Sequence, residues 1–316
     1  MGMETILILN LLFLLFFCNN KLMKKIIIID SNSVIHRAFH ALPPLKNKKG
    51  EVVNAVYGYL TFLFKAIREL EPDYIAACFD VSKCTFRKEI FEEYKAQRQK
   101  APDELYFQIP LVKEVLRKFN IAVFEKEGYE GDDLIGTISK KENGNLQKII
   151  LSGDLDNLQL INEQVKVVFL GNSISALSIY DAKKVEEKYE LRPDQIVDFK
   201  ALKGDASDNI PGVLGIGEKT AVNLLKEFGS LENVYNNIDS ISGKTKDKLI
   251  EGKEKAYLSK ELARIRTDVE FDFDIEKCKW GEFEKEEVIK AFEEFGFKTL
   301  IAKIPGGSKG DNLKLF

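Results

Sequence analysis

Three short segments of the chain are almost continuously apolar, and each ends on an acidic residue. The segments are 25–30, 74–80 and 148–154, and their last residues are Asp30, Asp80 and Asp154. Continuous apolar runs, rather than alternating ones, are typical of strands buried on both faces of a parallel sheet. Helical patterns lie between them, at 54–70, 105–119 and 132–141. This alternation predicts an α/β fold with a mostly parallel central sheet flanked by helices.

The composition of the chain limits which nucleic-acid and metal sites it can contain. Its 316 residues include 47 basic and 50 acidic ones, so there is no overall positive field to attract nucleic acid, and any such contact needs a local basic patch. Four cysteines without C-x-x-C spacing and two histidines exclude a disulfide scaffold and a zinc site. A metal site would therefore have to consist of carboxylates.

Nine carboxylates are candidates for such a site. They are Asp30, Asp80, Glu130, Asp132, Asp133, Asp154, Asp156, Asp205 and Asp208. Parallel strands bring their carboxyl ends to one edge, where α/β proteins bind ligands. Any one aspartate taken alone is better explained as a helix N-cap than as a metal ligand. Several ionised carboxylates in one place repel one another unless cations are present, and oxygen ligands suit Mg²⁺ or Mn²⁺. Two such ions about 4 Å apart can promote phosphodiester hydrolysis.

Residues 82–100 form a basic stretch with interleaved aromatics. It has six basic and three acidic residues, together with Phe86, Phe91 and Tyr94. Such a composition is found in segments that bind single-stranded nucleic acid. A solvated helix face is the alternative interpretation, and composition alone does not separate the two.

The chain divides into four predicted parts. Residues 1–22 are an apolar extension whose core, 6–18, would span only about 20 Å as a helix. Because "MKKIIIID" reads as a natural start, we expect translation to begin at Met23, with a weak membrane anchor as the alternative. A catalytic α/β domain is expected at 23–198, a small helical subdomain at 199–304 and a flexible tail at 305–316.

Several long motifs, in order, resemble the 5′-nuclease (flap endonuclease) family, especially the 5′→3′ exonuclease domain of bacterial DNA polymerase I. The matching segments are "IIIIDSNSVIHRAFHALP", "FDVSKCTFRKEIFEEYKAQR", "GYEGDDLIGT", "ILSGDLDNLQLI" and "GDASDNIPGVLGIGEKTA". The resemblance covers residues 23–305 and lacks polymerase and proofreading parts, which implies a stand-alone nuclease. It implies a PIN-like sheet, a helical arch and a helix-three-turn-helix DNA-binding subdomain. It also implies that all nine carboxylates line a site for two or three Mg²⁺ or Mn²⁺ ions.

The resemblance assigns further roles near the basic stretch. It selects Arg37, Tyr94, Lys95 and Arg98 as site residues. Lys95 and Arg98 would hold the scissile phosphate, and Tyr94 would stack on the unpaired terminal base. Residues 82–100 would then belong to an arch beside which a 5′ single strand passes, and we expect this segment to be mobile without substrate.

A glycine-rich turn follows the last acidic pair. It contains Gly212, Gly215, Gly217, Lys219 and Thr220. Glu218 interrupts the G-K-[ST] of a P-loop, so this turn is not a P-loop. Glycines that lead into a helix expose N–H groups to an anion, although an ordinary helix–helix turn has the same composition. The resemblance makes this turn a helix-hairpin-helix that binds a duplex strand, with K⁺ held by backbone carbonyls.

The last five residues, Asn312, Leu313, Lys314, Leu315 and Phe316, are similar to the peptide with which bacterial replication proteins bind the sliding clamp, except that asparagine replaces glutamine. A linear motif after a glycine-rich linker suits that use. We also expect a monomer that acts in the cytoplasm on nucleoid DNA.

Together these observations predict a structure-specific, metal-dependent 5′→3′ exonuclease or 5′-flap endonuclease in primer removal, replication and repair. One alternative is a non-catalytic protein that binds DNA junctions, which would be expected to lack some of the acids. Another is a small-molecule phosphatase, but Ser31 and Asn32 after Asp30 do not supply its D-x-D sequence.

Overall fold

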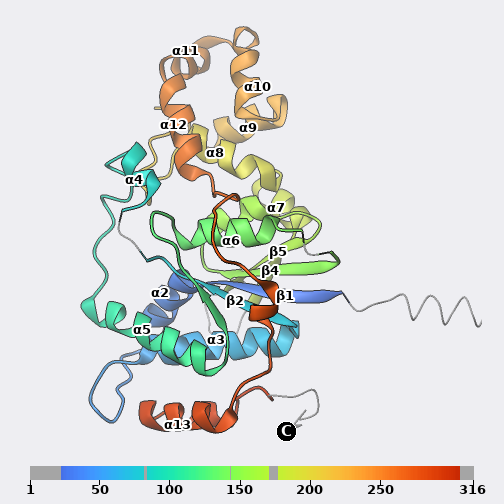
Figure 1. Ribbon diagram of the computed structural model, residues 1–316. Helices are drawn as coiled ribbons and strands as arrows, with labels where there is room; N and C mark the ends of the chain where they lie inside the picture. Colours follow the sequence, from blue (N-terminus) through green and yellow to red (C-terminus); the bar gives the residue numbers. More distant parts are fainter. Residues whose placement is uncertain (1–22, 82–83, 143, 171–176, 307–316) are drawn as a thin grey trace, which may run out of the picture.

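The computed structural model describes residues 23–81, 84–142, 144–170 and 177–306, and its centre is a six-stranded sheet (Figure 1). The strands are β1 Lys24–Asp30, β2 Tyr74–Cys78, β3 Ala122–Phe124, β4 Leu146–Ser152, β5 Val165–Leu170 and β6 Leu177–Tyr180. Their order is β3-β2-β1-β4-β5-β6, and only the β5–β6 pair is antiparallel. The predicted mostly parallel sheet is confirmed.

Helices cover both faces of the sheet, which is why its central strands are apolar throughout. On one face, Ile27 and Ile29 of β1 join a core with α2, α3 and α5. On the other face, Ile26 and Ile28 join a core with α6, η1 and α7. These helices are α2 Ser31–Ala41, α3 Asn54–Leu70, α5 Asp103–Lys118, α6 Gly131–Lys140, the 3-10 turn η1 Leu155–Leu160, and α7 Ala182–Tyr189.

A helical unit stands beyond one edge of the sheet, at the top of Figure 1. Its helices are α8 Ile196–Lys203, α9 Glu218–Phe228, α10 Leu231–Asn236, α11 Gly243–Glu251 and α12 Lys253–Ala263. They enclose a separate core that includes Leu202, Val213 and Leu225. The predicted helical subdomain is therefore present as a distinct packing unit.

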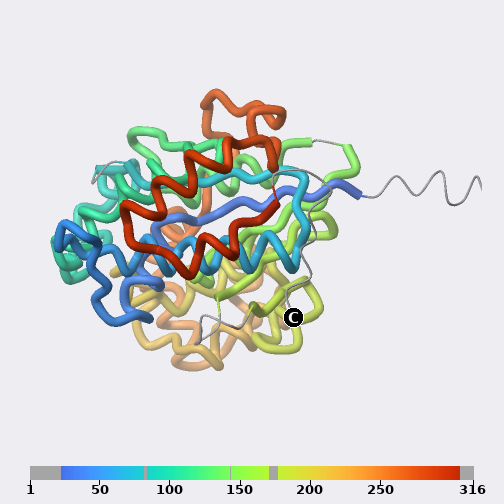
Figure 2. Tube along the Cα trace, turned by 90° about the horizontal axis from the view of Figure 1, so that it is seen from below, coloured from blue at the N-terminus to red at the C-terminus, as the bar shows by residue number. Residues whose placement is uncertain are grey.

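The chain returns from the helical unit to the sheet through residues 262–269, which we call the return segment; it comprises the last two residues of α12 and the chain that follows them. It lies against α6, since the Thr137 hydroxyl accepts a hydrogen bond from the Val269 N–H at 3.1 Å. Helices α13 Lys285–Phe295 and α14 Lys298–Ile301 then cover the α3/α5 face (Figure 2). Phe292 of α13 contacts Phe64 and Phe119 there. The structure thus differs from the predicted division, because the last part of 199–304 belongs to the core of the sheet domain.

The basic stretch is less helical than a helical arch would be. Among its described residues, only α4, Phe86–Ile90, is helical, and residues 92–97 form turns. Turn residues contact the helical unit, because the Lys95 N–H donates to the Asp208 carbonyl at 2.9 Å. Ser82 and Lys83 lie outside the described residues.

The predicted extension at 1–22 and the clamp-like peptide at 312–316 also lie outside the described residues. In the parts of the chain that the structure does describe, none of the helices combines the length and the hydrophobicity needed to cross a bilayer.

Candidate active site

The ends of β1 and β2 place two aspartates at one edge of the sheet. Asp30 ends β1 and caps α2, because its side chain accepts a hydrogen bond from the Ser33 N–H at 3.1 Å. Asp80 follows β2 and accepts from the Gly131 N–H at 2.6 Å. This second contact joins the end of β2 to the start of α6, where Glu130 precedes the helix. Asp30 is therefore both a helix N-cap and an acid at the edge of the sheet, so the two interpretations of this residue do not exclude each other.

The side chains of Ser152 and Asn157 connect acids from three elements through hydrogen bonds. The Ser152 hydroxyl donates to Asp30 at 2.6 Å and accepts from the Asp154 N–H at 2.8 Å. The Asn157 amide donates to Asp132 at 3.0 Å and lies 3.3 Å from the same serine oxygen. Ser152 and Asn157 were not predicted as site residues, although both flank acids within "LSGDLDN". They bring Asp30, Asp132 and Asp154 to one place.

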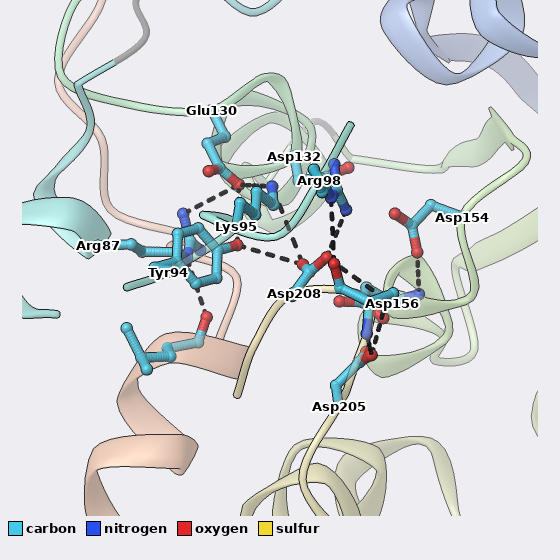
Figure 3. A network of polar contacts seen from close by, with 12 residues as sticks. Arg87, Tyr94, Lys95, Arg98, Glu130, Asp132, Asp154, Asp156, Asp205 and Asp208 are labelled. Atoms are coloured by element: carbon cyan, nitrogen blue, oxygen red, sulfur yellow. Dashed lines mark hydrogen bonds and ion pairs between the residues drawn. The ribbon is translucent and has the colours of Figure 1, made fainter. Parts of the chain in front are cut away.

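Lysine and arginine side chains link the acids of the sheet domain to those of the helical unit (Figure 3). The Lys200 ammonium contacts Asp156 of η1 and lies 2.6 Å from Asp205. Arg98 forms an ion pair with Asp208, so the basic stretch also reaches this loop. Lys200 was missed because it lies in the interior of α8, away from any recognisable motif.

Burial perturbs the acids at the centre of the site. Burial raises the pKa of Asp30 to about 7, and the charges of Asp154 and Asp80 add to the effect. Burial raises the pKa of Asp132 well above its usual range, and it raises the pKa of Asp156 to about 6 although Lys200 opposes the shift. Asp205 differs from these acids. Burial alone would raise its pKa, but hydrogen bonds from Lys200 and Ser207 outweigh burial and lower the pKa to about 2.

The donor set fits hard divalent cations. Asp30, Asp132 and Asp156 have raised pKa values because they are buried close to other acids. A bound divalent cation would stabilise their ionised form, and carboxylate oxygens are the ligands that such cations prefer. In the conformation described, no three acidic, histidine or cysteine side chains among the residues with assigned positions lie close enough to enclose an ion. Lys95, Arg98 and Lys200 lie among the acids instead. Metal binding at this site therefore requires the acids to exchange some of these ammonium and guanidinium contacts.

Asp133 does not belong to the acid cluster, which corrects its prediction as a ligand. Its side chain is fully buried, and both of its oxygens accept hydrogen bonds from Arg87 at 2.8 Å. The Arg266 N–H donates to it as well, at 2.9 Å. These donors occupy the directions from which an ion would approach. Arg87 itself was not predicted as a site residue.

Tyr94 also differs from its predicted role. The residue is 3% exposed and packs with Ile210 and Leu262, so in this conformation its ring offers no face to a base. Its hydroxyl lies 3.4 Å from both Glu130 and Asp208. Burial, followed by the charge of Glu130, raises its pKa strongly. Tyr94 is therefore a packed link between the basic stretch and the acids.

Two of the three predicted cationic residues, Lys95 and Arg98, contact the acids directly. The Lys95 ammonium lies 2.8 Å from Glu130 and 3.9 Å from Asp208. Arg98 is half exposed beside Asp208. Arg37 lies on α2 near the loop that carries Asp154, since a Cβ added to Gly153 would be 3.8 Å from the Arg37 Cδ. An incoming phosphate would therefore meet positive charge next to the carboxylates.

The glycine turn separates into a packed part and an exposed part. Gly212 is buried, with φ +61°, and an added Cβ would lie 2.3 Å from the Gly204 nitrogen. It serves packing, so its prediction as a DNA contact is wrong for this conformation. Gly215 and Gly217 are exposed, and the space beside Gly217, just before α9, is open. The Lys248 ammonium donates to the Gly215 carbonyl at 2.9 Å.

Lys219 and Thr220 lie in the first turn of α9, where Lys219 is exposed and Thr220 is partly exposed. A helix N-terminus with exposed glycines before it favours an anion. This part of the turn can therefore approach a phosphate, unlike Gly212.

Two family models match most of the chain. The model described as 5′-3′ exonuclease, N-terminal resolvase-like domain, matches residues 25–190. The model described as 5′-3′ exonuclease, C-terminal SAM fold, matches residues 191–286. The two matched ranges meet just after α7, where the chain enters the helical unit.

Similar curated proteins include two bacterial DNA polymerases I. The one from Bacillus subtilis (strain 168) is 44% identical over 283 residues, which are 89% of this chain and 32% of that protein. The one from Bacillus caldotenax is 45% identical over 294 residues, which are 92% of this chain and 34% of that protein. The chain spans about one third of the length of these relatives.

Solved structures of 5′-nucleases share the fold. The T5 5′-exonuclease with bound zinc ions aligns with a TM-score of 0.64 and 22% identity, over 77% of this chain and 90% of that one. Flap endonuclease-1 from Methanococcus jannaschii aligns with a TM-score of 0.56 and 21% identity, over 89% of this chain and 90% of that one. These likenesses establish the PIN-like architecture with its helical unit.

Proposed function

The chain belongs to the 5′-3′ exonuclease family, and on that premise we propose that it is a metal-dependent 5′-nuclease. It hydrolyses DNA near a junction of single and double strand, at a 5′ end or a 5′ flap, and leaves a 5′-phosphate. The observation that carries the proposal is the meeting of acids from β1, β2, α6, η1 and the helical unit beside Lys95 and Arg98. Primer removal, replication and repair are the processes that need such a reaction.

Eight of the nine predicted acids remain candidates for the metal site. They are Asp30, Asp80, Glu130, Asp132, Asp154, Asp156, Asp205 and Asp208. Mg²⁺ or Mn²⁺, in two or three positions, suits this oxygen-only set. When bound, these ions supply activation of water and stabilisation of the leaving oxygen. The raised pKa values of Asp30 and Asp156 support the proposal, because a nearby divalent charge would offset the burial that raises them.

The basic residues position the substrate. Lys95 and Arg98 are close enough to the acids to bind a phosphate that lies against them, and they would move from Glu130 and Asp208 when it arrives. Arg37 of α2 lies near the loop of Asp154 and would add positive charge there. Holding the phosphodiester in this way supplies proximity and charge stabilisation.

The helical unit binds the duplex without reading bases. The exposed glycines at 215 and 217, with Lys219 and Thr220, form its phosphate contact, and K⁺ at the hairpin carbonyls is part of the same proposal. A duplex held there would extend toward the acids, because the loop that carries Asp205 and Asp208 directly precedes the hairpin. Binding of the clamp by residues 312–316, a monomeric state and action on nucleoid DNA in the cytoplasm stay predictions.

The test is a 5′-labelled flap oligonucleotide incubated with Mg²⁺ or with EDTA, followed by product mapping. We expect cutting near the junction that needs Mg²⁺ and yields a 5′-phosphate on the downstream strand. p-Nitrophenyl phosphate is the comparison substrate, and hydrolysis of it alone would identify a small-molecule phosphatase. Binding of the flap without any cutting, in Mg²⁺ and in Mn²⁺, would instead support the non-catalytic junction-binding protein.

A further inference from the structure

A buried guanidinium joins three distant segments behind the acid cluster. Arg87 of α4 is 2% exposed, and its two terminal nitrogens each donate to Asp133 of α6 at 2.8 Å. Its remaining donors reach the return segment, where Nε bonds the Leu262 carbonyl at 2.9 Å and Nη2 bonds the Arg264 carbonyl at 2.7 Å. One side chain therefore binds the basic stretch, α6 and the exit of the helical unit together.

Asp133 completes the junction from the other side. Besides Arg87, it accepts from the Glu130 N–H at 3.1 Å and from the Arg266 N–H at 2.9 Å. The Glu130 carboxylate itself lies 3.6 Å from Arg87 Nη1. The position of Glu130, a candidate ligand, thus depends on both members of the pair through its backbone and through its side chain.

The return segment also contacts the second acid-bearing element, η1. The Ile265 N–H donates to the Gln159 side chain at 2.9 Å, and the amide of the same glutamine donates to the Ala263 carbonyl at 3.1 Å. On α6, a Cβ added to Gly136 would lie 2.5 Å from the Arg266 carbonyl oxygen, so helix and segment are in close contact. The chain that leaves the helical unit is therefore bonded to α6 and η1, two of the elements that carry acids at their starts.

Arginine is the side chain that this junction requires. Its planar fork matches a carboxylate with two parallel hydrogen bonds and still has donors for two carbonyls, whereas lysine offers one compact ammonium. Removing either partner would leave a buried charge without its counter-charge. The arrangement is thus specific in geometry, and not only a means of neutralising charge.

We propose that Arg87 and Asp133 form a positioning pair that fixes Glu130 and the first turn of α6 to the return segment. The pair keeps the spacing of the acids constant while the helical unit holds a duplex. Neither residue contacts the reacting atoms. The inference rests on the proposed nuclease function, and it replaces the predicted ligand role of Asp133.

The test compares Arg87→Lys, Asp133→Asn and the double variant with the wild type. Outer contacts of this kind typically change metal affinity or activity by about 10- to 100-fold. In calorimetric titrations of the full chain with Mn²⁺, we expect each single variant to bind at least about tenfold more weakly. Single-turnover cutting of the flap at saturating Mg²⁺ should slow by a similar factor, while flap binding in Ca²⁺ stays within about threefold. Because the residues act as one unit, the double variant should be no worse than the poorer single variant.

Lys260→Met is the matched control. Lys260 is also a buried cation, paired with Asp198 at 2.6 Å and Glu232 at 2.7 Å, but it lies within the helical unit. It should lower the melting temperature and leave Mn²⁺ affinity and the cutting rate below that temperature unchanged. If Arg87→Lys does not fold, Asp133→Asn, which keeps the shape of the side chain, provides the same comparison.

Three outcomes would overturn the inference. The first is a loss of melting temperature alone, with Mn²⁺ affinity and cutting rate intact. The second is a double variant in which the factors lost by the two single variants, in Mn²⁺ affinity or in cutting rate, multiply. That result would mean that the two residues act separately. The third is an equal loss of Mn²⁺ affinity in the Lys260 control. A wild type that binds Mn²⁺ but cuts no DNA would refute the nuclease proposal, while the Mn²⁺ comparison would still test the pair.

Discussion

Replacement of Asp30 by asparagine separates the stability of the acid cluster from its function. Burial raises the pKa of Asp30 from its usual value of about 4 to about 7. Between these two values the folded protein keeps a proton that the unfolded chain has lost. The free energy of unfolding of the metal-free protein should therefore fall as the pH rises through this window. Asparagine has no proton to lose, and it can keep the bond to the Ser33 N–H.

The size of the effect follows from the shift. One pKa unit corresponds to about 1.4 kcal/mol, and the range from pH 5 to pH 8 includes about two units of the window. Asp30 alone should therefore cost the wild type in EDTA about 3 kcal/mol of unfolding free energy between pH 5 and pH 8, and Asp30→Asn should lack this share of the loss. Since Asp132 and Asp156 titrate in the same cluster, the variant retains part of the slope.

Urea denaturation in EDTA at pH 5, 6, 7 and 8 measures this directly. Asp247→Asn, at an exposed position on α11, is the matched control and should follow the wild type. Adding Mg²⁺ at pH 8 should restore stability to the wild type and much less to Asp30→Asn, which should also fail to cut DNA. A wild type that is equally stable at pH 5 and pH 8 without metal would refute the reasoning, because the carboxylates would then not share an uncompensated site.

Three further predictions concern other parts of the site. Asp156→Asn should abolish cutting of the flap while binding in Ca²⁺ persists; cutting at the wild-type rate would remove Asp156 from the ligands. Lys200→Met should lower the free energy of unfolding of the metal-free protein by about 2 kcal/mol and tighten Mn²⁺ binding, because the ammonium no longer competes for Asp156; unchanged Mn²⁺ affinity in calorimetry would contradict this. Gly212→Ala should destabilise the protein by at least about 2 kcal/mol in thermal unfolding, whereas Gly217→Ala, where a Cβ meets nothing within 4 Å, should change little; equal melting temperatures would contradict the packing role.

The sheet and its covering helices were predictable because the signals for them are local. Helix α3 was predicted with the bounds it has, and α5 and α6 within two residues at each end. The acids were found because strand ends converge at one edge of a parallel sheet, whatever the details of the loops. Strands β3, β5 and β6 were not predicted. β3 has three residues and β6 four, with one buried side chain in each, so their patterns are weak.

The residues that were missed act across long stretches of sequence. Arg87 meets Asp133 46 positions away, and Lys200 meets Asp156 44 positions away. Nothing in either local sequence indicates the partner. Tyr94 shows the same limit, because its burial depends on Leu262 of α12 and not on the aromatic pattern around it. Only the tertiary arrangement distinguishes such a side chain from a surface stacking residue.

The path of the chain makes the helical unit an insertion between two parts of the sheet domain. The chain enters it after α7, and beyond the unit the return segment bonds to α6 and η1. A chimaera that exchanges this unit with that of a relative should therefore be joined after Glu190 and before Leu262. A join at residue 286, where the match to the C-terminal family model ends, would also replace the carbonyls that bond Arg87. The return segment of the donor protein would then determine how the acids of the recipient are positioned.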